Sequence, residues 1–263
     1  MNINDFKTRK ENLSPISMIT CYDYWSATLI SQTDIDTILV GDSLGMVSHG
    51  FTSTLPVDVD LMVLHTAAVR RGAPDKFIVT DLPFLSHRKS IDSVIDSVSK
   101  IMKAGANAVK IEGIDGHEET IRFIVESGVP VMGHLGLTPQ SFNAFGGFKV
   151  QSKSKSEAEK LERDAKKLQE LGCFAVVLEC IPDSVGTKVS KALNIPTIGI
   201  GAGKDTDGQV LVLQDMLGVN TGYTPKFVRK FIDGASLITN AISEYDNTVK
   251  NGSFPTKKES YGG

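Results

Sequence analysis

Short apolar runs alternate with longer amphipathic runs along this chain, and this alternation restricts the fold more than any other feature. Four of the amphipathic runs have helical periodicity, at residues 59–71, 90–105, 118–128 and 156–172. Strand–helix–strand alternation with nearly continuous apolar strands is typical of a parallel sheet that is covered on both faces. The runs that we interpret as strands are residues 15–23, 37–43, 77–83, 107–113, 129–136, 174–180, 195–203 and 209–215.

Eight strands between residues 15 and 215 favour a closed (β/α)8 TIM barrel of the α/β class over the alternative, an open parallel sheet. The sequence shows no internal repeat and no linker, so we expect residues 1–263 to form a single barrel domain. The polar, Gly-containing end of the chain, from about residue 250, is expected to be a mobile tail.

The composition excludes several classes of protein. With 28 basic and 31 acidic residues, the chain is not expected to bind nucleic acid through its net charge. No apolar stretch approaches the ~18 residues that a membrane span needs, and the first residues lack the apolar core of a signal peptide. Three cysteines without metal-site spacing suit a reducing compartment. We therefore expect a cytoplasmic protein whose partners are small molecules.

Charged residues stand at or near the carboxyl ends of four of the expected strands. They are Asp42, Asp81, Lys110 with Glu112, and Glu179. A buried charge is costly unless a partner neutralises it, and in a TIM barrel the carboxyl ends of the strands converge on the active site. The positions of these residues therefore predict one site at the barrel mouth.

The alternation of side chains along a strand predicts which of these residues point inward. Lys110 and Glu112 are two positions apart and face the same way, whereas Val109 and Ile111 face the opposite layer. Apolar residues must pack on the outer helices, so the charged pair should point into the barrel. The same reasoning turns Glu179 inward.

Asp42, Asp81 and Glu112 end consecutive strands, which lie about 4.8 Å apart. Like charges at that separation repel by about 3 kcal/mol at an effective dielectric constant near 20. A cation between them would relieve the repulsion, and an all-oxygen ligand set favours Mg²⁺. The alternative is a set of buried ion pairs, with Lys110 as the partner and raised carboxyl pKa values.

His134 lies between two glycines near the end of the fifth expected strand, in GHLGLTP. It could bind a substrate oxygen, or it could support another site residue through a hydrogen bond. GIGAG at residues 199–203 lacks the third glycine of a dinucleotide-binding loop, so we interpret it as a tight turn whose amides approach a ligand.

Several longer motifs resemble the ketopantoate hydroxymethyltransferase (3-methyl-2-oxobutanoate hydroxymethyltransferase) family. They are VGDSLGMV, STLPV, HTAAVRRGAP, DLPF, AGANAVKIEG, VPVMGHLGLTPQS, FGGFKVQ, VLECIP and IPTIGIGAG followed by TDGQVLVLQD. The likeness runs from about residue 3 to about residue 255. It implies a barrel like those of phosphoenolpyruvate mutase and isocitrate lyase, a Mg²⁺-dependent step toward pantothenate and coenzyme A, and a large homo-oligomer resembling a decamer.

The resemblance also implies roles for individual residues. Asp42 and Asp81 match the family's metal-binding aspartates, and Glu112 matches its third acidic group at the metal. Asp42 with Ser43, Asp81 and Lys110 match the positions that bind the oxoacid substrate, and Glu179 matches the catalytic base. The co-substrate that the family uses is 5,10-methylenetetrahydrofolate, and the sequence itself contains no folate motif.

These residues are also chemically suited to one another. A cation at the aspartates would acidify the carbon next to the keto group of an α-oxoacid. Lys110 would stabilise the developing enolate oxygen, Ser43 would hold the carboxylate, and Glu179 would remove the proton. Two rival functions remain open: another Mg²⁺-dependent enolate enzyme, such as a carbon–carbon lyase or phosphonomutase, and a barrel that binds a metabolite without turnover.

Overall fold

The computed structural model describes residues 1–262, and contacts between residues divide the chain into two compact units, Met1–Val212 and Leu213–Gly263. The first unit contains every strand. Each unit is described here by itself, and the expectation of a single domain with a mobile tail stays a prediction.

The first unit is a closed barrel of parallel strands, in which each strand pairs with its neighbours in chain order and β8 pairs with β1. The strands are β1 (Ile16–Thr20), β2 (Thr37–Val40), β3 (Phe77–Asp81), β4 (Ala108–Glu112), β5 (Val131–Gly136), β6 (Ala175–Glu179), β7 (Thr197–Ile200) and β8 (Gly208–Leu211). The predicted (β/α)8 barrel is therefore confirmed, and each expected strand overlaps an observed one.

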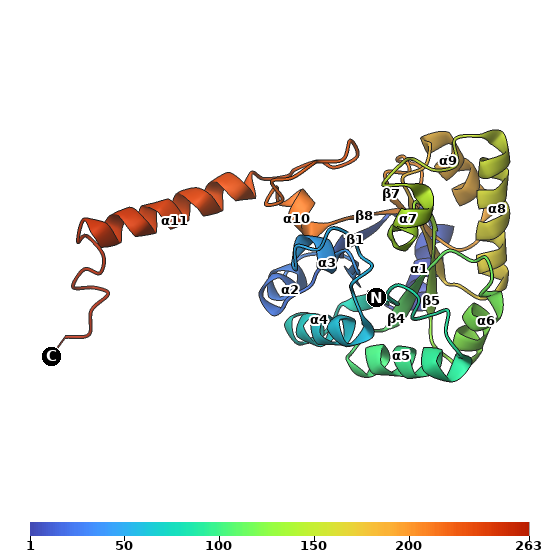
Figure 1. The fold of residues 1–263 in the computed structure, drawn as a ribbon, viewed down its shortest axis with the longest axis horizontal. Helices are drawn as coiled ribbons and strands as arrows, with labels where there is room; N and C mark the ends of the chain where they lie inside the picture. The colour runs from blue at the N-terminus through green and yellow to red at the C-terminus, as the bar shows by residue number, and fades with distance from the viewer. Residues whose placement is uncertain (263) are drawn as a thin grey trace. The chain divides into compact units, whose positions relative to one another are not determined.

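Helices surround the barrel on the outside (Figure 1). The four expected helices are present as α4 (Val59–Gly72), α5 (Ile91–Lys103), α6 (Glu118–Glu126) and α8 (Lys155–Glu170). Asp58 caps the first of them by accepting a hydrogen bond from the Leu61 amide, and Ser154 caps α8 in a capping box with Glu157. The elements that we did not predict are α1 (Ile3–Glu11), α2 (Tyr24–Ser31), α3 (Leu44–Val47), η1 (Pro139–Ser141), α7 (Phe142–Phe145) and α9 (Asp183–Ala192).

The second unit consists of α10 (Leu213–Met216), a long irregular segment and α11 (Gly234–Lys250). The strand expected at 209–215 was too long, because the chain leaves the sheet after Leu211 and enters α10 at Leu213. Apolar residues recur along α11 at helical spacing, at Leu237, Ile238, Ile242 and Tyr245. Within residues 1–262 no helix is long and apolar enough to cross a membrane.

Alternate residues of each strand face two different cores. The inner core fills the barrel and contains Met132, Val177 and Val210, whereas the outer core beneath the helices contains Val109 and Ile111. This arrangement confirms the predicted orientation of β4. Its outward residues stabilise the contact with the helices, and its inward residues are free to form a site.

An aromatic cluster closes the end of the barrel at which the strands begin. Phe6 of α1 is fully buried, and its ring centroid lies 5.3 Å from that of Phe77 and 4.9 Å from that of Phe174, both in edge-to-face geometry. Loss of a buried phenylalanine side chain typically costs 3–5 kcal/mol, so this cluster contributes substantially to stability. It also leaves the opposite end of the barrel as the open one.

Candidate active site

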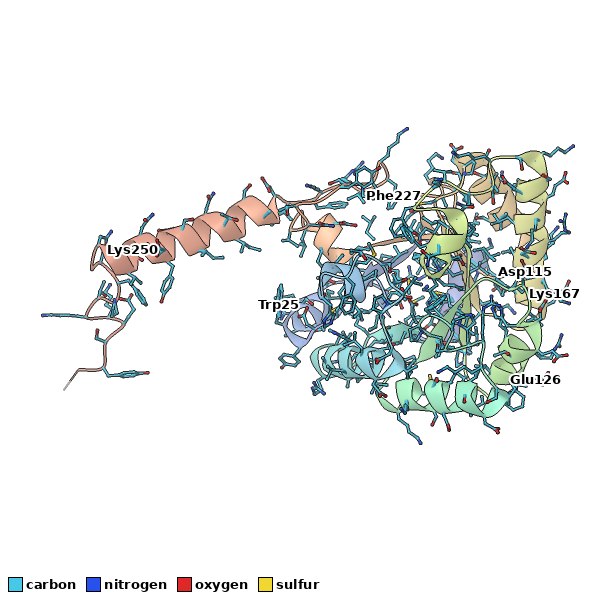
Figure 2. The ribbon with its side chains drawn as sticks, viewed as in Figure 1. Trp25, Asp115, Glu126, Lys167, Phe227 and Lys250 are labelled. Carbon is cyan, nitrogen blue, oxygen red and sulfur yellow. The ribbon has the colours of Figure 1, made fainter. Side chains whose placement is uncertain are left out.

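The predicted site residues gather in one pocket at the carboxyl ends of the strands. The pocket has a volume of about 90 Å³. Other charged residues of the first unit, such as Glu126 and Lys167, project from the outside of the barrel (Figure 2). The pocket is lined by residues that include Asp42, Ser43, Asp81, Lys110, Glu112, His134, Pro139, Val177, Glu179 and Ile200.

A larger surface hollow of about 760 Å³ lies at the opposite end of the barrel, around Arg9, Asp36 and Lys76. None of the predicted site residues lines it. Because catalytic residues of TIM barrels lie at the carboxyl ends of the strands, the smaller pocket is the better candidate.

Lys110 is the cation at the centre of the site, and only 4% of it is exposed. Its Nζ lies 3.0 Å from Asp81 Oδ1, 3.8 Å from Glu112 Oε1 and 3.1 Å from His134 Nδ1. Burial alone would lower the pKa of Lys110, but the surrounding carboxylates more than offset this effect and raise the pKa above its ordinary value. The lysine therefore stays charged.

Asp42 and Asp81 are adjacent, buried carboxylates. The Asp42 amide donates a hydrogen bond to Asp81 Oδ2, with a length of 3.0 Å, and each residue is 3% exposed. Burial raises the pKa of Asp42 well above its ordinary value, and the charges of Asp81 and Glu112 raise it further. Burial also raises the pKa of Asp81, against the opposing effect of Lys110. When both carboxylates are ionised, their negative charge therefore exceeds the single positive charge of Lys110.

Glu112 differs from the two aspartates in its contacts. Its Oε2 accepts a hydrogen bond of 3.0 Å from the Gln140 amide, and its Oε1 faces Lys110 and His134. Within the described part of the chain, residues 1–262, no three His, Cys, Asp or Glu side chains are arranged as a ready metal site. The carboxylate oxygens of Asp42, Asp81 and Glu112 are donors of the kind that a hard cation prefers, and their role as metal ligands stays a prediction. Mg²⁺ is commonly bound by one or two carboxylates together with water and substrate oxygens.

His134 connects Lys110 to Glu179. Burial and the neighbouring Lys110 lower the pKa of His134, so its ring is neutral. If Nδ1 accepts from the Lys110 ammonium at 3.1 Å, the ring proton is on Nε2, which lies 3.2 Å from Glu179 Oε2. This last pair is close but is not aligned as a hydrogen bond. The structure thus places His134 in contact with the candidate base; whether it also binds a substrate oxygen stays a prediction.

A glycine sets the position of the backbone that carries Glu179. Gly136 ends β5 with a φ angle of +92°, and a Cβ atom there would lie 2.3 Å from the Glu179 carbonyl oxygen. Glycine adopts this left-handed backbone without strain. Any side chain at residue 136 would push the end of β6 outward.

Two further residues of the site were not predicted. Gln140, in η1, donates from its side-chain amide to Asp42 Oδ2 at 2.8 Å, and Tyr22 pairs its hydroxyl with that of Ser43 at 2.8 Å. Both are buried. The position of Gln140 directly after Thr138 and Pro139, in a strand-end loop, was the signal that could have identified it.

Comparison with known sequences gives a consistent result. A family model described as ketopantoate hydroxymethyltransferase matches residues 1–257. A 3-methyl-2-oxobutanoate hydroxymethyltransferase from Coxiella burnetii is 53% identical over 256 residues, which are 97% of this chain and 96% of that protein. Another from Bdellovibrio bacteriovorus is 54% identical over 259 residues, which are 98% of both chains.

Solved structures with the same architecture have much lower sequence identity. A 2,3-dimethylmalate lyase of the PEP mutase/isocitrate lyase superfamily aligns with a TM-score of 0.63 and 13% identity, over 98% of this chain and 91% of that chain. A phosphonopyruvate hydrolase in complex with oxalate and Mg²⁺ also has a TM-score of 0.63, with 11% identity over 98% of this chain and 93% of that chain. These likenesses confirm the expected barrel type. Together with the near-complete sequence match, they show that the chain belongs to the ketopantoate hydroxymethyltransferase family.

Proposed function

We propose that this enzyme transfers a hydroxymethyl group from 5,10-methylenetetrahydrofolate to 3-methyl-2-oxobutanoate and forms 2-dehydropantoate (ketopantoate) in pantothenate and coenzyme A biosynthesis. The single observation that carries the proposal is that one pocket is lined by Glu179, Lys110 and the Asp42–Asp81 pair. The membership of the family supports the substrate and the type of reaction.

Asp42 and Asp81, with Glu112 as the third acidic group, are the residues that would hold Mg²⁺. The buried carboxylates of Asp42 and Asp81 repel each other, and a hard divalent cation bound by both would relieve this repulsion. The bound cation would act as a Lewis acid that acidifies the carbon–hydrogen bond at C3 of the oxoacid.

The chain's own side chains supply the remaining functions. The Lys110 ammonium stabilises negative charge on the keto oxygen as the enolate forms. The Ser43 hydroxyl, held by Tyr22, is placed to bind the substrate carboxylate. Glu179 removes the C3 proton, and its side chain is 17% exposed, so it is accessible from the pocket mouth. His134 lies beside this base, with its Nε2 3.2 Å from Glu179 Oε2.

The proposed bond changes balance. The C3 proton goes to Glu179, and the electron pair of that bond forms the new carbon–carbon bond to the methylene carbon of the donor. Both carbon–nitrogen bonds of the donor's methylene carbon break: the enolate displaces one nitrogen, and a water oxygen, which becomes the product hydroxyl, displaces the other. Each nitrogen keeps the electron pair of its broken bond, and the two nitrogens take up the C3 proton, by way of Glu179, and one proton of the water. A pocket of about 90 Å³ suits a small oxoacid, so the bulk of the folate must lie outside it.

The positions of the cysteines argue against one rival function, a related lyase that uses a loop cysteine as its general acid. Cys21 and Cys173 are buried, and Cys180 directly follows β6. Burial raises the pKa of the Cys180 thiol to about 12, so this group is a poor proton donor near neutral pH.

Assembly into a homo-oligomer, resembling a decamer, forms part of the same proposal. The apolar stripe of α11, which includes Leu237, Ile238 and Ile242, supports it, because such a stripe needs a packing partner. Light scattering at micromolar concentration should give a multiple of 28.4 kDa. A mass equal to one chain would contradict the assembly.

Proton exchange at C3 of 3-methyl-2-oxobutanoate tests the function. With Mg²⁺ and without folate, the wild type should exchange the C3 proton with deuterated water, as followed by NMR. Glu179→Gln keeps the size of the side chain but removes the base, so exchange and hydroxymethyl transfer should both fall by roughly 10²–10⁴-fold. Binding of the oxoacid should change only a few-fold, and Glu126→Gln on the outer surface serves as the matched control.

Two results would contradict the proposal. Absence of exchange by the wild type would favour a barrel that binds the oxoacid without turnover. Normal exchange per folded molecule in Glu179→Gln, together with a large drop in melting temperature, would make Glu179 a structural partner rather than the base.

A further inference from the structure

Gln140 contacts residues at or just after the ends of three strands, β2, β3 and β4. Its side-chain Nε2 donates to Asp42 Oδ2 at 2.8 Å and to the Leu82 carbonyl oxygen at 2.9 Å. Its backbone amide donates to Glu112 Oε2 at 3.0 Å. The residue itself comes from η1, after β5, and is 6% exposed.

These contacts use the full donor capacity of Gln140. A glutamine amide carries two N–H donors on Nε2, and here one binds a carboxylate while the other binds the backbone at the end of β3. The hydrogen bond to the Leu82 carbonyl oxygen orients the Gln140 side-chain amide, and the oriented amide in turn restrains Asp42 Oδ2. A neutral donor does this without adding charge to a site that already holds Lys110.

Fixing one oxygen of Asp42 has a consequence for the other. The hydrogen bond from Gln140 to Oδ2 restrains the rotation of the Asp42 carboxylate and therefore restrains the direction of its second oxygen. Partners that orient a ligand in this way typically contribute 10- to 100-fold to metal affinity or activity.

We infer that Gln140 is the positioning residue that orients Asp42 for the cation and the oxoacid, while its backbone amide holds Glu112 beside them. This inference rests on the proposed function, because it assigns Gln140 a role at the same site. Gln140 acts through Asp42 and needs no contact with the substrate.

Gln140→Met separates the side-chain role from the backbone role. Methionine has a similar length and fills the same buried space, and the backbone amide that binds Glu112 remains. Calorimetric titration with Mg²⁺ alone should show binding that is weaker by roughly 10- to 100-fold. In steady-state assays KM for the oxoacid should rise more than kcat falls.

Two further variants make the test specific. Gln140→Glu keeps the shape but places an oxygen where the donor stood, so the oxoacid should bind at least as weakly as in Gln140→Met. Gln169→Met is the matched control, because the Gln169 side chain binds the Asn194 and Ile195 amides at the opposite end of the barrel. It should leave Mg²⁺ and oxoacid binding unchanged even if its melting temperature falls.

The outcomes distinguish this inference from the proposed function. Weak Mg²⁺ binding by folded Gln140→Met supports the positioning role, even if the wild type fails to exchange the C3 proton and the proposed reaction is wrong. Wild-type affinities for Mg²⁺ and the oxoacid in either folded Gln140 variant would overturn the inference, whatever the reaction. A variant that loses only melting temperature would assign Gln140 a purely structural role.

Discussion

Replacing Lys110 with methionine should destabilise the protein in a way that depends on pH. Methionine keeps most of the length of the side chain but removes the cation that lies among the buried carboxylates. We expect this variant to unfold at lower denaturant concentration than the wild type at pH 8 in EDTA, and to approach the wild type at pH 5.

The magnitude follows from two distances, those from Lys110 Nζ to Asp81 Oδ1 and to Glu112 Oε1. At an effective dielectric constant near 20, a unit charge pair at 3.0 Å is worth about 5.5 kcal/mol, and a pair at 3.8 Å about 4.4 kcal/mol. Removing one partner of a buried pair costs about 3–5 kcal/mol after the desolvation of the lysine is taken into account. The expected loss of unfolding free energy at pH 8 is therefore about 3–5 kcal/mol.

The sign of the pH dependence follows from the pKa shifts. The folded-state pKa values of Asp81 and Glu112 are raised by burial, and Lys110 opposes that rise. Without Lys110 the folded-state pKa values of Asp81 and Glu112 rise further. The stability of the variant is therefore fully present below the ordinary carboxyl pKa and is lost as the pH rises through the higher folded-state values. The raised pKa of Lys110 keeps it charged across this range. The gap between the two proteins should therefore widen from pH 5 to pH 8.

Urea unfolding of both proteins at the two pH values measures this gap. Lys100→Met is the matched control, because the Lys100–Asp60 pair is exposed and its removal should leave the unfolding midpoint unchanged. An equal gap at both pH values, or no gap at pH 8, would refute the reasoning that the carboxylates stay charged because of Lys110.

Two further substitutions test the binding residues. Asp81→Asn should abolish Mg²⁺ binding and, with it, most of the oxoacid affinity, and calorimetry that finds undiminished oxoacid affinity with and without EDTA would contradict this. Tyr22→Phe removes the hydroxyl that binds Ser43, a bond worth about 0.5–1.5 kcal/mol, so KM for the oxoacid should rise by roughly 2–10-fold at constant kcat. Unchanged KM would show that Ser43 keeps its position without this bond, and Tyr245→Phe on exposed α11 is the control.

The barrel was predictable because its strands and helices carry their own local signals. The apolar runs and the helical periodicity predicted all of the strands and the helices α4, α5, α6 and α8. Alternation along β4 predicted which side of that strand bears charge, and both cores confirm it. The short elements α3 and α7 and the helix α1, with its mostly polar sequence, give no comparable pattern.

The limits of prediction are clearest at Gln140 and Tyr22. Gln140 binds Asp42 across 98 positions of the chain, and Tyr22 reaches Ser43 across 21. Asp81 and Glu179 were predicted because a charge at the end of an apolar strand is costly to bury. Gln140 and Tyr22 are uncharged, so this argument does not identify them. Such contacts depend on how loops fold over the barrel mouth, and one strand's periodicity does not contain that information.

The aromatic closure around Phe6 has a kinetic consequence. A barrel filled by its own side chains and closed by Phe6, Phe77 and Phe174 at the end where the strands begin leaves the pocket to be entered from the carboxyl ends of the strands. Under the proposed function, the small oxoacid would occupy the inner position, and the folate, which is too large for the pocket, would cover the way out. The reactants should then add in a compulsory order, with the oxoacid first and the folate second. Tetrahydrofolate should leave before the new, longer oxoacid. A folate that binds the vacant enzyme first should block entry of the oxoacid, and high folate concentrations should therefore slow turnover.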